Sequence, residues 1–232
     1  MSVDIGSYNA DPERYQQLVD EMYRDHPPIT LPPEYAYFFE KDLIRLFLRL
    51  ARYKFVARHL RKTDRVLEVG CGSGVGCMLL SQHCAHVTGI DVKSTELDEA
   101  RSMNRRPNVE FRQEDLFDIA EPASYDAVVA LDVIEHMPVE QGERLLRGMA
   151  RVLKPTGMAV IGTPSIYSYP YQSSFSQASH VKCYDRDELV GVMERVFERT
   201  LAFSMNDEMV HTGHPKMAWY YFVLALMPRT GR

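Results

Sequence analysis

Short aliphatic runs alternate along this chain with stretches whose apolar residues recur every three or four positions. The runs are typical of buried β-strands, and the three-to-four spacing is typical of helices that bury one face. Their order predicts strands alternating with helices, as in a doubly wound α/β sheet. The seven strands expected are residues 65–69, 86–90, 108–112, 125–131, 158–163, 199–205 and 219–226.

Helices are expected between these strands and also before the first of them. Asp11 and Pro12 favour the first turn of a helix, so a helix is expected up to about Arg24. Prolines at 27, 28, 32 and 33 interrupt it, and the pattern beyond them predicts one long helix. That helix is expected over residues 34–60, later helices over 75–83, 93–103, 140–153 and 185–197, and a turn over 154–157.

One side of the expected long helix carries Arg45, Arg49 and Arg52. Such a row of charges is usually a solvated face. A second interpretation is that these arginines meet an anionic substrate or the carboxylate of a cofactor. The sequence leaves both open.

The length and composition suit one soluble α/β domain. We expect a single folding unit, in which residues 1–62 are a helical segment that contributes to the cofactor and acceptor pocket. Residues 63–232 then form the main domain, with a lid at about residues 165–180. A monomer or a homodimer is compatible with this organisation.

Charge and cysteine content narrow the partners and the compartment. The formal net charge is −5, which makes a nucleic-acid partner unlikely. The four cysteines form no C-x-x-C pair, and the start of the chain has neither a cationic region nor an apolar one. No apolar run reaches the ~20 residues that span a bilayer. We therefore expect a cytoplasmic protein without membrane attachment.

The stretch from residue 66 to residue 91 combines a strand, a glycine-rich break, a helix and a second strand. Gly70, Gly72 and Gly74 follow the first strand, so the backbone can turn sharply and approach a ligand closely. The helix that starts there points free N–H groups at the turn. Asp91 ends the second strand, where a carboxylate can accept hydrogen bonds from ribose hydroxyls. The stretch predicts a nucleotide-type cofactor site.

The glycines do not fit the G-x-G-x-x-G/A fingerprint of dinucleotide sites, since Val75 and Cys77 occupy the last position in the two registers. The pattern acid-x-Gly-x-Gly-x-Gly at residues 68–74 instead resembles motif I of the class I S-adenosylmethionine-dependent methyltransferases. GID at residues 89–91 and LKPTG at residues 153–157 also resemble that family. The resemblance implies a Rossmann-like sheet of seven strands that ends in an antiparallel pair, with S-adenosyl-L-methionine as cofactor.

The resemblance also implies roles for individual residues. The glycine turn would wrap the methionine portion of the cofactor, Asp91 would bind the ribose, and Asp115 with Leu116 would bind the adenine. An alternative for Asp115 is that it caps a turn. The cofactor-binding residues expected are Glu68, Gly70, Cys71, Gly72, Gly74, Asp91, Val92, Asp115, Leu116 and Leu131.

Candidate reaction chemistry follows the fourth strand, where Asp132, Glu135 and His136 stand together, and His180 follows the next strand. These side chains are suitable ligands for one divalent cation, Mg²⁺ or another, which would lower the pKa of a hydroxyl acceptor. The set resembles that of small-RNA 2′-O-methyltransferases, and its Glu-His part resembles the ubiquinone-biosynthesis O-methyltransferases. Both groups usually have Glu where this chain has the shorter Asp132. In the alternatives, His136 or His180 is a general base without metal, or Asp132 caps the loop while Glu135 and His136 bond locally.

Residues 165–179 mix small polar residues with Tyr167, Tyr169, Tyr171 and Phe175, and their lack of periodicity is typical of a functional lid. We expect Glu135, His136 and His180 to act in the reaction under this lid. The function expected is methylation of a hydroxyl on a small-molecule acceptor. The alternatives are an RNA 2′-O-methyltransferase, a metal-independent N-methyltransferase and a non-catalytic binding subunit.

Overall fold

The computed structural model describes residues 11–229, and by its contacts the chain divides into Met1–Leu31 and Pro32–Arg232. The first unit contains helix α1 (Pro12–Asp25). The Asp11 carboxylate accepts a hydrogen bond from the backbone N–H of Arg14 at 2.9 Å, which confirms the predicted helix start. The expectation that the chain starts without a secretory signal concerns mainly residues 1–10, which lie outside the described residues.

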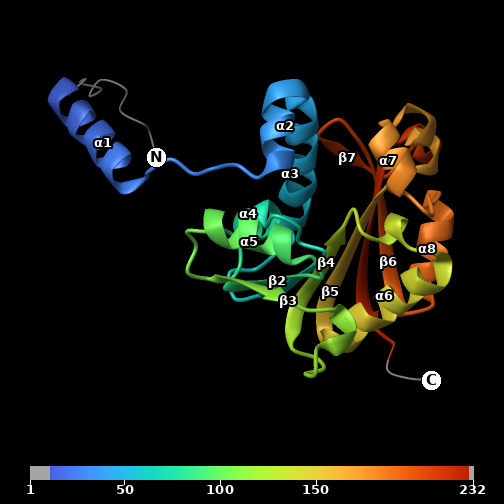
Figure 1. Ribbon diagram of the computed structural model, residues 1–232. Helices are drawn as coiled ribbons and strands as arrows, with labels where there is room; N and C mark the ends of the chain where they lie inside the picture. The colour runs from blue at the N-terminus through green and yellow to red at the C-terminus, as the bar shows by residue number, and fades with distance from the viewer. Residues whose placement is uncertain (1–10, 230–232) are drawn as a thin grey trace, which may run out of the picture. The chain divides into compact units, whose positions relative to one another are not determined.

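The second unit is built on one sheet of eight strands in the order β3-β2-β1-β4-β5-β8-β6-β7 (Figure 1). β1 to β5 run parallel, and β8 inserts antiparallel between β5 and β6. The strands are β1 (Arg65–Val69), β2 (His86–Asp91), β3 (Val109–Gln113), β4 (Tyr125–Leu131), β5 (Leu153–Pro164), β6 (Phe197–Asn206), β7 (Met209–His211) and β8 (Tyr220–Pro228). This confirms the doubly wound α/β fold. The unforeseen strand is β7, which is too short to carry an alternating pattern.

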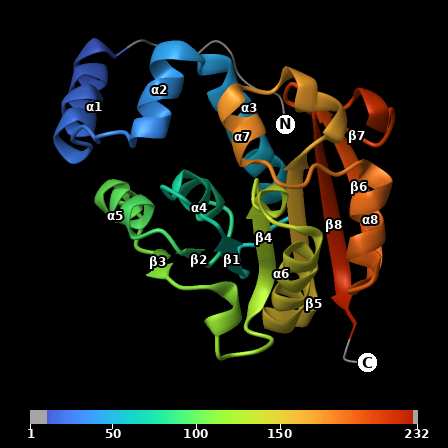
Figure 2. The same ribbon diagram turned by 45° about the vertical axis from the view of Figure 1, so that its right-hand side comes forward.

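Helices cover both faces of the sheet, and each face has its own apolar core (Figures 1 and 2). Residues of α3, α4 and α5 pack on one face, among them Val56, Leu80 and Leu97. Residues of α6 and α8 pack on the other, among them Met149 and Leu189. The helices of this unit are α2 (Pro33–Lys41), α3 (Leu43–Ala57), α4 (Val75–Leu80), α5 (Ser94–Met103), α6 (Val139–Val152), α7 (Ser174–Ser179) and α8 (Arg186–Glu194).

The single long helix expected over residues 34–60 is wrong, because the chain breaks at Asp42 into α2 and α3. Asp42 has φ −154° and ψ 64°, outside the helical region, and its carboxylate accepts from the N–H of Arg45 at 3.2 Å. An aspartate is among the best helix N-caps, and this local bond competes with helix continuation.

The turn expected over residues 154–157 is also corrected, since these residues belong to β5. Tyr125 pairs with Leu153, whereas Ala127 pairs with Met158. Residues 154–157, which include a proline and a glycine, therefore form an irregularity opposite β4. The extra residues bulge out of the ladder without ending the strand.

The lid segment, residues 165–180, follows β5 and contains two short helices, the 3₁₀ helix η4 (Ile166–Tyr171) and α7. It lies at the end of the sheet where β4 ends (Figure 2). Three further 3₁₀ turns are η2 (Leu116–Asp118), η3 (Ile134–His136) and η5 (Pro215–Met217). None of the helices in residues 11–229 combines the length and apolar character that crossing a bilayer requires.

Candidate cofactor and acceptor site

The glycine turn between β1 and α4 adopts a backbone that L side chains rarely allow. Gly70, Gly72 and Gly74 have φ of 69°, 51° and 77°. A Cβ on Gly74 would lie 2.5 Å from the Phe111 ring. The N–H groups of Gly70 and Cys71 donate to the carbonyl of Ile90 at 2.9 and 3.1 Å, which joins the turn to β2. This turn fits a cradle in which a ligand meets bare backbone.

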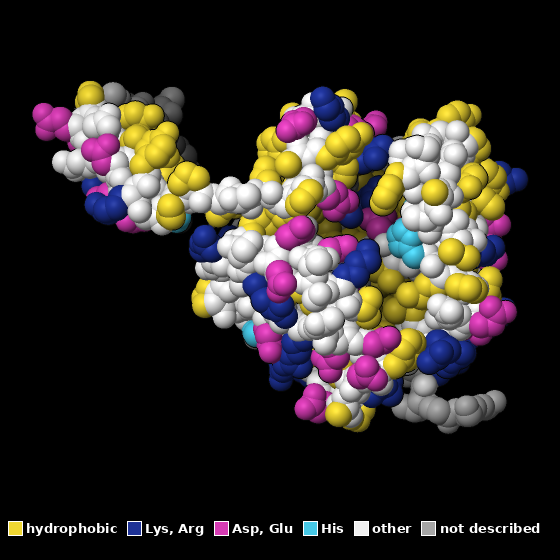
Figure 3. All heavy atoms as spheres, viewed as in Figure 1, with side chains coloured by type: hydrophobic (Ala, Val, Ile, Leu, Met, Phe, Trp, Pro, Cys, Tyr) yellow, Lys and Arg dark blue, Asp and Glu magenta, His cyan; other side chains and the backbone are white. Residues whose placement is uncertain are grey.

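Asp91 ends β2 directly beside this turn. Its carboxylate accepts from the N–H of Gly72 and from the N–H of Lys93, both at 3.0 Å. The face that carries this end of the sheet is hollowed between the α4–α5 part and the lid side, and charged and histidine side chains gather around the hollow (Figure 3). The structure therefore brings together the glycine turn and the aspartate that the sequence predicts as a cofactor site.

Glu68 lies beneath the turn, with 1% of its surface exposed. The Tyr53 hydroxyl of α3 donates to its Oε1 at 2.7 Å, while its Oε2 is buried without a hydrogen-bond partner among the described residues. Burial raises the pKa of Glu68 to about 7, although the neighbouring Cys77 and Tyr53 act to lower it. A Cβ on Gly76 would clash with both Tyr53 and Glu68. The absence of a side chain at Gly76 therefore leaves room for the Tyr53–Glu68 hydrogen bond.

The arginine row of α3 is only partly solvated. Arg45 pairs with its neighbour Asp42 and keeps 44% of its side chain exposed. Arg49 and Arg52 are 25% and 22% exposed, and they pair with Glu34 and Asp132. Arg52 also stacks on the ring of Tyr220 at 4.0 Å. Arg52 thus reaches the end of β4, whereas Arg49 pairs with α2, so the row is neither a solvated face nor a single anion site.

The remaining residues expected at the cofactor differ in exposure. The exposed Asp115 accepts from the N–H of Phe117 at 3.0 Å and caps η2, which is the alternative the sequence offered. Leu116 is 3% exposed and packs closely against α6. A Cβ on Gly148 of that helix would lie 2.9 Å from the Leu116 side chain. Val92 is 62% exposed, and Leu131 is buried at the end of β4.

Glu135, His136 and His180 come together beyond the end of β4. One ligand atom from each lies within 4.8 Å of the others, and the two imidazole centroids are 5.1 Å apart. Nδ1 of His136 is 2.9 Å from the carbonyl of Ser179, and Thr163 donates to Glu135 Oε2 at 3.0 Å. Glu135 Oε1 and His180 Nδ1 are buried and have no hydrogen-bond partner within the described part of the chain.

The electrostatics of this cluster favour a cation. Burial raises the pKa of Glu135 to about 8, with a further contribution from the charge of Asp132. Burial and the neighbouring His136 lower the pKa of His180, so its ring is neutral at pH 7. A buried carboxyl group with an unpaired oxygen beside two imidazoles fits the ligand set of a divalent metal.

Asp132, the fourth residue expected at a metal, has another partner. Both carboxylate oxygens accept from Arg52 Nη1, at 2.8 and 2.7 Å. Its φ of 58° places it in the left-handed region, which Asp tolerates better than most residues. The structure thus groups three of the four expected ligands and ties Asp132 to α3.

Comparison with known proteins identifies one domain of the chain. A family model described as "Methyltransferase domain" matches residues 66–157, the stretch from β1 to the first residues of β5. The chain contains a methyltransferase domain. Together with relatives named as S-adenosylmethionine-dependent methyltransferases, this match supports the class I type that the motifs at residues 68–74 and 89–91 resemble, with S-adenosylmethionine as cofactor.

Relatives of this methyltransferase domain match only part of the chain. A probable S-adenosylmethionine-dependent methyltransferase of Mycobacterium tuberculosis is 34% identical over 130 residues, which is 55% of this chain and 46% of that protein. A ubiquinone biosynthesis O-methyltransferase of Neisseria meningitidis is 36% identical over 106 residues, 43% of each chain. The chain therefore matches less than half the length of these curated relatives.

A solved methyltransferase structure supports the fold. The S-adenosylmethionine-dependent methyltransferase of Thermotoga maritima, described as a possible histamine N-methyltransferase, superposes with a TM-score of 0.65. The match covers 93% of this chain and 98% of the other, at 16% identity. At that identity the likeness concerns the fold alone.

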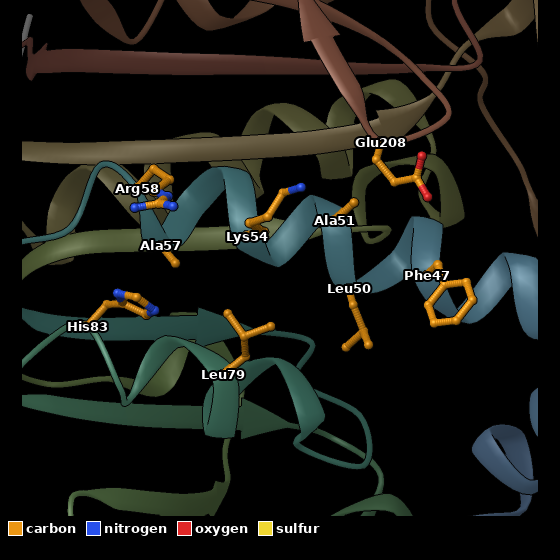
Figure 4. Close-up of a pocket in the computed structure, with 9 residues that line it drawn as sticks. All are labelled: Phe47, Leu50, Ala51, Lys54, Ala57, Arg58, Leu79, His83 and Glu208. Carbon is orange, nitrogen blue, oxygen red and sulfur yellow. The ribbon is translucent and has the colours of Figure 1, made fainter. Parts of the chain in front are cut away.

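The second unit also has a separate hollow of about 450 Å³ on the outer side of α3, toward α4 and the β6–β7 turn (Figure 4). Its walls are mainly apolar, with charged side chains at the rim. The lining residues are Phe47, Leu50, Ala51, Lys54, Ala57, Arg58, Leu79, His83 and Glu208. No residue of the glycine turn or of the Glu135 cluster lines it, so this hollow is distinct from the cofactor site.

Proposed function

We propose that this chain transfers the methyl group of S-adenosylmethionine to a hydroxyl of a small-molecule acceptor, with a divalent cation at the Glu135 cluster. The observation that carries the proposal is the convergence of Glu135, His136 and His180 at the sheet end that also holds the glycine turn. The relationship to ubiquinone biosynthesis O-methyltransferases supports oxygen as the atom methylated.

The cofactor would be held between the glycine turn and the ends of β2 and β3. Gly70, Cys71, Gly72 and Gly74 would surround its methionine portion, with Glu68 supporting the turn from below. Asp91 has free lone pairs beyond its two backbone bonds and would accept from the ribose hydroxyls. The residues proposed at the adenosine are Asp91, Val92, Asp115, Leu116 and Leu131.

Methyl transfer is an in-line displacement in which the acceptor oxygen bonds to the methyl carbon while the carbon–sulfur bond breaks. The electron pair of that bond stays on sulfur, which gives neutral S-adenosylhomocysteine. A divalent cation here would supply Lewis acidity that lowers the pKa of the acceptor hydroxyl. Glu135, His136 and His180 would hold the cation, and the hydroxyl proton would pass to water. In the alternative without a cation, the ring of His180 is suited to accept that proton.

The lid segment would exclude water from the acceptor. The segment that carries Tyr167 and Tyr169, each about two-fifths exposed, ends at His180 of the Glu135 cluster. Aromatic faces favour a ring or sugar as acceptor, and they also favour the positive sulfonium. These properties suit a small acceptor better than a long nucleic acid, as does the net charge of −5.

The cofactor part is tested by calorimetry with S-adenosylhomocysteine. Asp91→Asn removes the charge that receives the ribose hydroxyls, and we expect binding weaker by roughly 10- to 100-fold. The matched control is Asp98→Asn in α5, an exposed carboxylate paired only with Arg101, for which no change is expected. Equal affinity of all three proteins would refute the assigned cofactor site.

The acceptor part is tested by transfer of labelled methyl groups to a panel of phenols, catechols and sugars. Product that forms with added cation and stops after dialysis against a chelator supports metal-assisted O-methylation. Activity that survives the chelator identifies a metal-independent enzyme instead. Labelling of RNA with binding that falls steeply on adding salt would identify the RNA 2′-O-methyltransferase alternative.

A further inference from the structure

The three residues of the Glu135 cluster belong to two separate segments. Glu135 and His136 lie on η3, directly after β4, whereas His180 ends the lid segment at the C-cap of α7. A cation bound by all three would therefore join the body of the domain to the lid.

The outer part of the lid has few anchors of its own. Helix α7 contains no buried residue, and Phe175 and Tyr171 are 83% and 74% exposed. Tyr169 and Gln177 bond to each other's backbone, which connects η4 to α7 but not to the domain body. A segment with so little buried apolar surface opens at low free-energy cost.

The lid is tied to the body at its two ends. At the start, the N–H of Ser165 donates to the carbonyl of Trp219 at 2.9 Å. At the other end, the N–H groups of Val181 and Lys182 donate to the carbonyl of Glu135 at 2.8 and 3.0 Å. The second tie uses the backbone of the residue whose side chain belongs to the cluster, so lid position and cluster geometry are coupled.

Neighbouring groups already orient the three side chains. The Ser179 carbonyl binds Nδ1 of His136 and leaves Nε2 free, and Thr163 binds one oxygen of Glu135 and leaves the other unpaired. Metal-binding histidines and carboxylates typically use one atom in this way for a supporting hydrogen bond. Ser179 is itself a lid residue, so its carbonyl supports a ligand on η3 across the same junction.

We propose that a divalent cation at Glu135, His136 and His180 fixes the lid segment over the acceptor, so that cation occupancy controls lid opening. The proposal rests on the cation part of the proposed function. It goes further in assigning the cation a conformational role that is independent of methyl transfer.

The test is amide hydrogen exchange of the full chain with and without Mn²⁺ alone, read by mass spectrometry. We expect Mn²⁺ to slow exchange in residues 166–180 by about tenfold and to leave α6 unchanged. A second signal is the fluorescence of Trp219, the single tryptophan, whose ring lies 5.9 Å from that of lid residue Tyr171. Mn²⁺ should change this fluorescence in a saturable way.

Variants assign the effect to the lid ligand. His180→Ala should abolish the protection by Mn²⁺ while S-adenosylhomocysteine binding, which reports an intact fold, stays unchanged. His211→Ala in β7, outside the cluster, should behave as the unmodified protein. Protection that persists in His180→Ala, or Mn²⁺ binding by calorimetry without slower lid exchange, would overturn the proposal.

Two outcomes separate this proposal from the proposed function. Slower lid exchange with Mn²⁺ in a protein that binds no S-adenosylhomocysteine supports the lid proposal and refutes the enzyme assignment. Absence of Mn²⁺ binding in a protein that still transfers methyl groups overturns the lid proposal and identifies a metal-independent methyltransferase.

Discussion

Arg52 on α3 and Asp132 at the end of β4, 80 residues apart, form an ion pair that uses both carboxylate oxygens. Their side chains are only 22% and 19% exposed. Burial lowers the pKa of Arg52, but the neighbouring Asp132 and Tyr220 outweigh this effect and leave the pKa raised, so Arg52 stays charged. The pair joins α3 to the strand end that carries the Glu135 cluster.

Removing one partner of this pair should destabilise the fold. We expect Arg52→Ala and Asp132→Asn each to lower the free energy of unfolding by about 3 kcal/mol, because a charge is left buried without its partner. Asn tolerates the left-handed backbone of position 132, so the change tests charge and not strain. Urea denaturation measures the effect, and the double variant should lose less than the sum of the two. Asp98→Asn, which weakens an exposed pair with Arg101, should cost under about 0.5 kcal/mol. Strict additivity of Arg52→Ala and Asp132→Asn would contradict the coupling.

Gly74 should be intolerant of a side chain, in contrast to Gly191 of α8. Gly74→Ala puts a Cβ on a φ of 77° and 2.5 Å from the Phe111 ring, so we expect a loss of about 2–4 kcal/mol in unfolding free energy. At Gly191 a Cβ meets nothing within 4 Å, and Ala is the better helix former by about 1 kcal/mol. Thermal unfolding should therefore move in opposite directions for the two variants. A neutral Gly74→Ala would contradict the described turn.

Glu68 should make stability depend on pH in an unusual direction. Its pKa of about 7 in the folded chain exceeds the ordinary value of 4.5, so between these values the folded state binds the extra proton. The stability that this raised pKa contributes to the folded state is complete below about pH 4.5 and is lost as the pH rises through 7. At about 1.4 kcal/mol per pKa unit the change is on the order of 3 kcal/mol. Urea unfolding at several pH values measures it, and Glu68→Gln, which cannot ionise, should remove this part of the dependence. An unchanged pH profile in that variant would refute the raised pKa.

Prediction from the sequence was most accurate for features that depend on residues adjacent along the chain. The glycine turn and the strand that ends at Asp91 follow from local requirements, namely positive φ and a buried parallel strand. The break at Asp42 is also local, but apolar spacing continues through it, so the cap was hidden by the helical pattern. Pro155 and Gly157 indicated a turn, whereas in the structure both residues lie within β5, which pairs with β4 on either side of them.

Contacts between distant segments lay beyond the sequence pattern. Nothing at Tyr53 or Arg52 indicates that they meet Glu68 and Asp132, because those pairings depend on how α3 packs against the sheet. The grouping of Glu135 and His136 with His180 was expected from the order of strand ends and from family resemblance, whereas the engagement of Asp132 by Arg52 was not.

That engagement leads to a prediction about the identity of the cation. With Asp132 held by Arg52, the cluster offers two imidazoles and one carboxylate, and imidazole ligands favour transition metals over Mg²⁺. We therefore expect Mn²⁺, Co²⁺ or Zn²⁺ to bind at least roughly tenfold more tightly than Mg²⁺ and to restore methyl transfer after dialysis against a chelator. Calorimetry and cation-dependent turnover measure this preference. Arg52→Ala frees the Asp132 carboxylate, so Mg²⁺ should bind more tightly and the preference for transition metals over Mg²⁺ should become smaller. Arg45→Ala frees only the Asp42 carboxylate and should leave that preference unchanged. Tighter binding of Mg²⁺ than of Mn²⁺ by the unmodified protein would show that Asp132 joins the cation and that the ion pair yields to it.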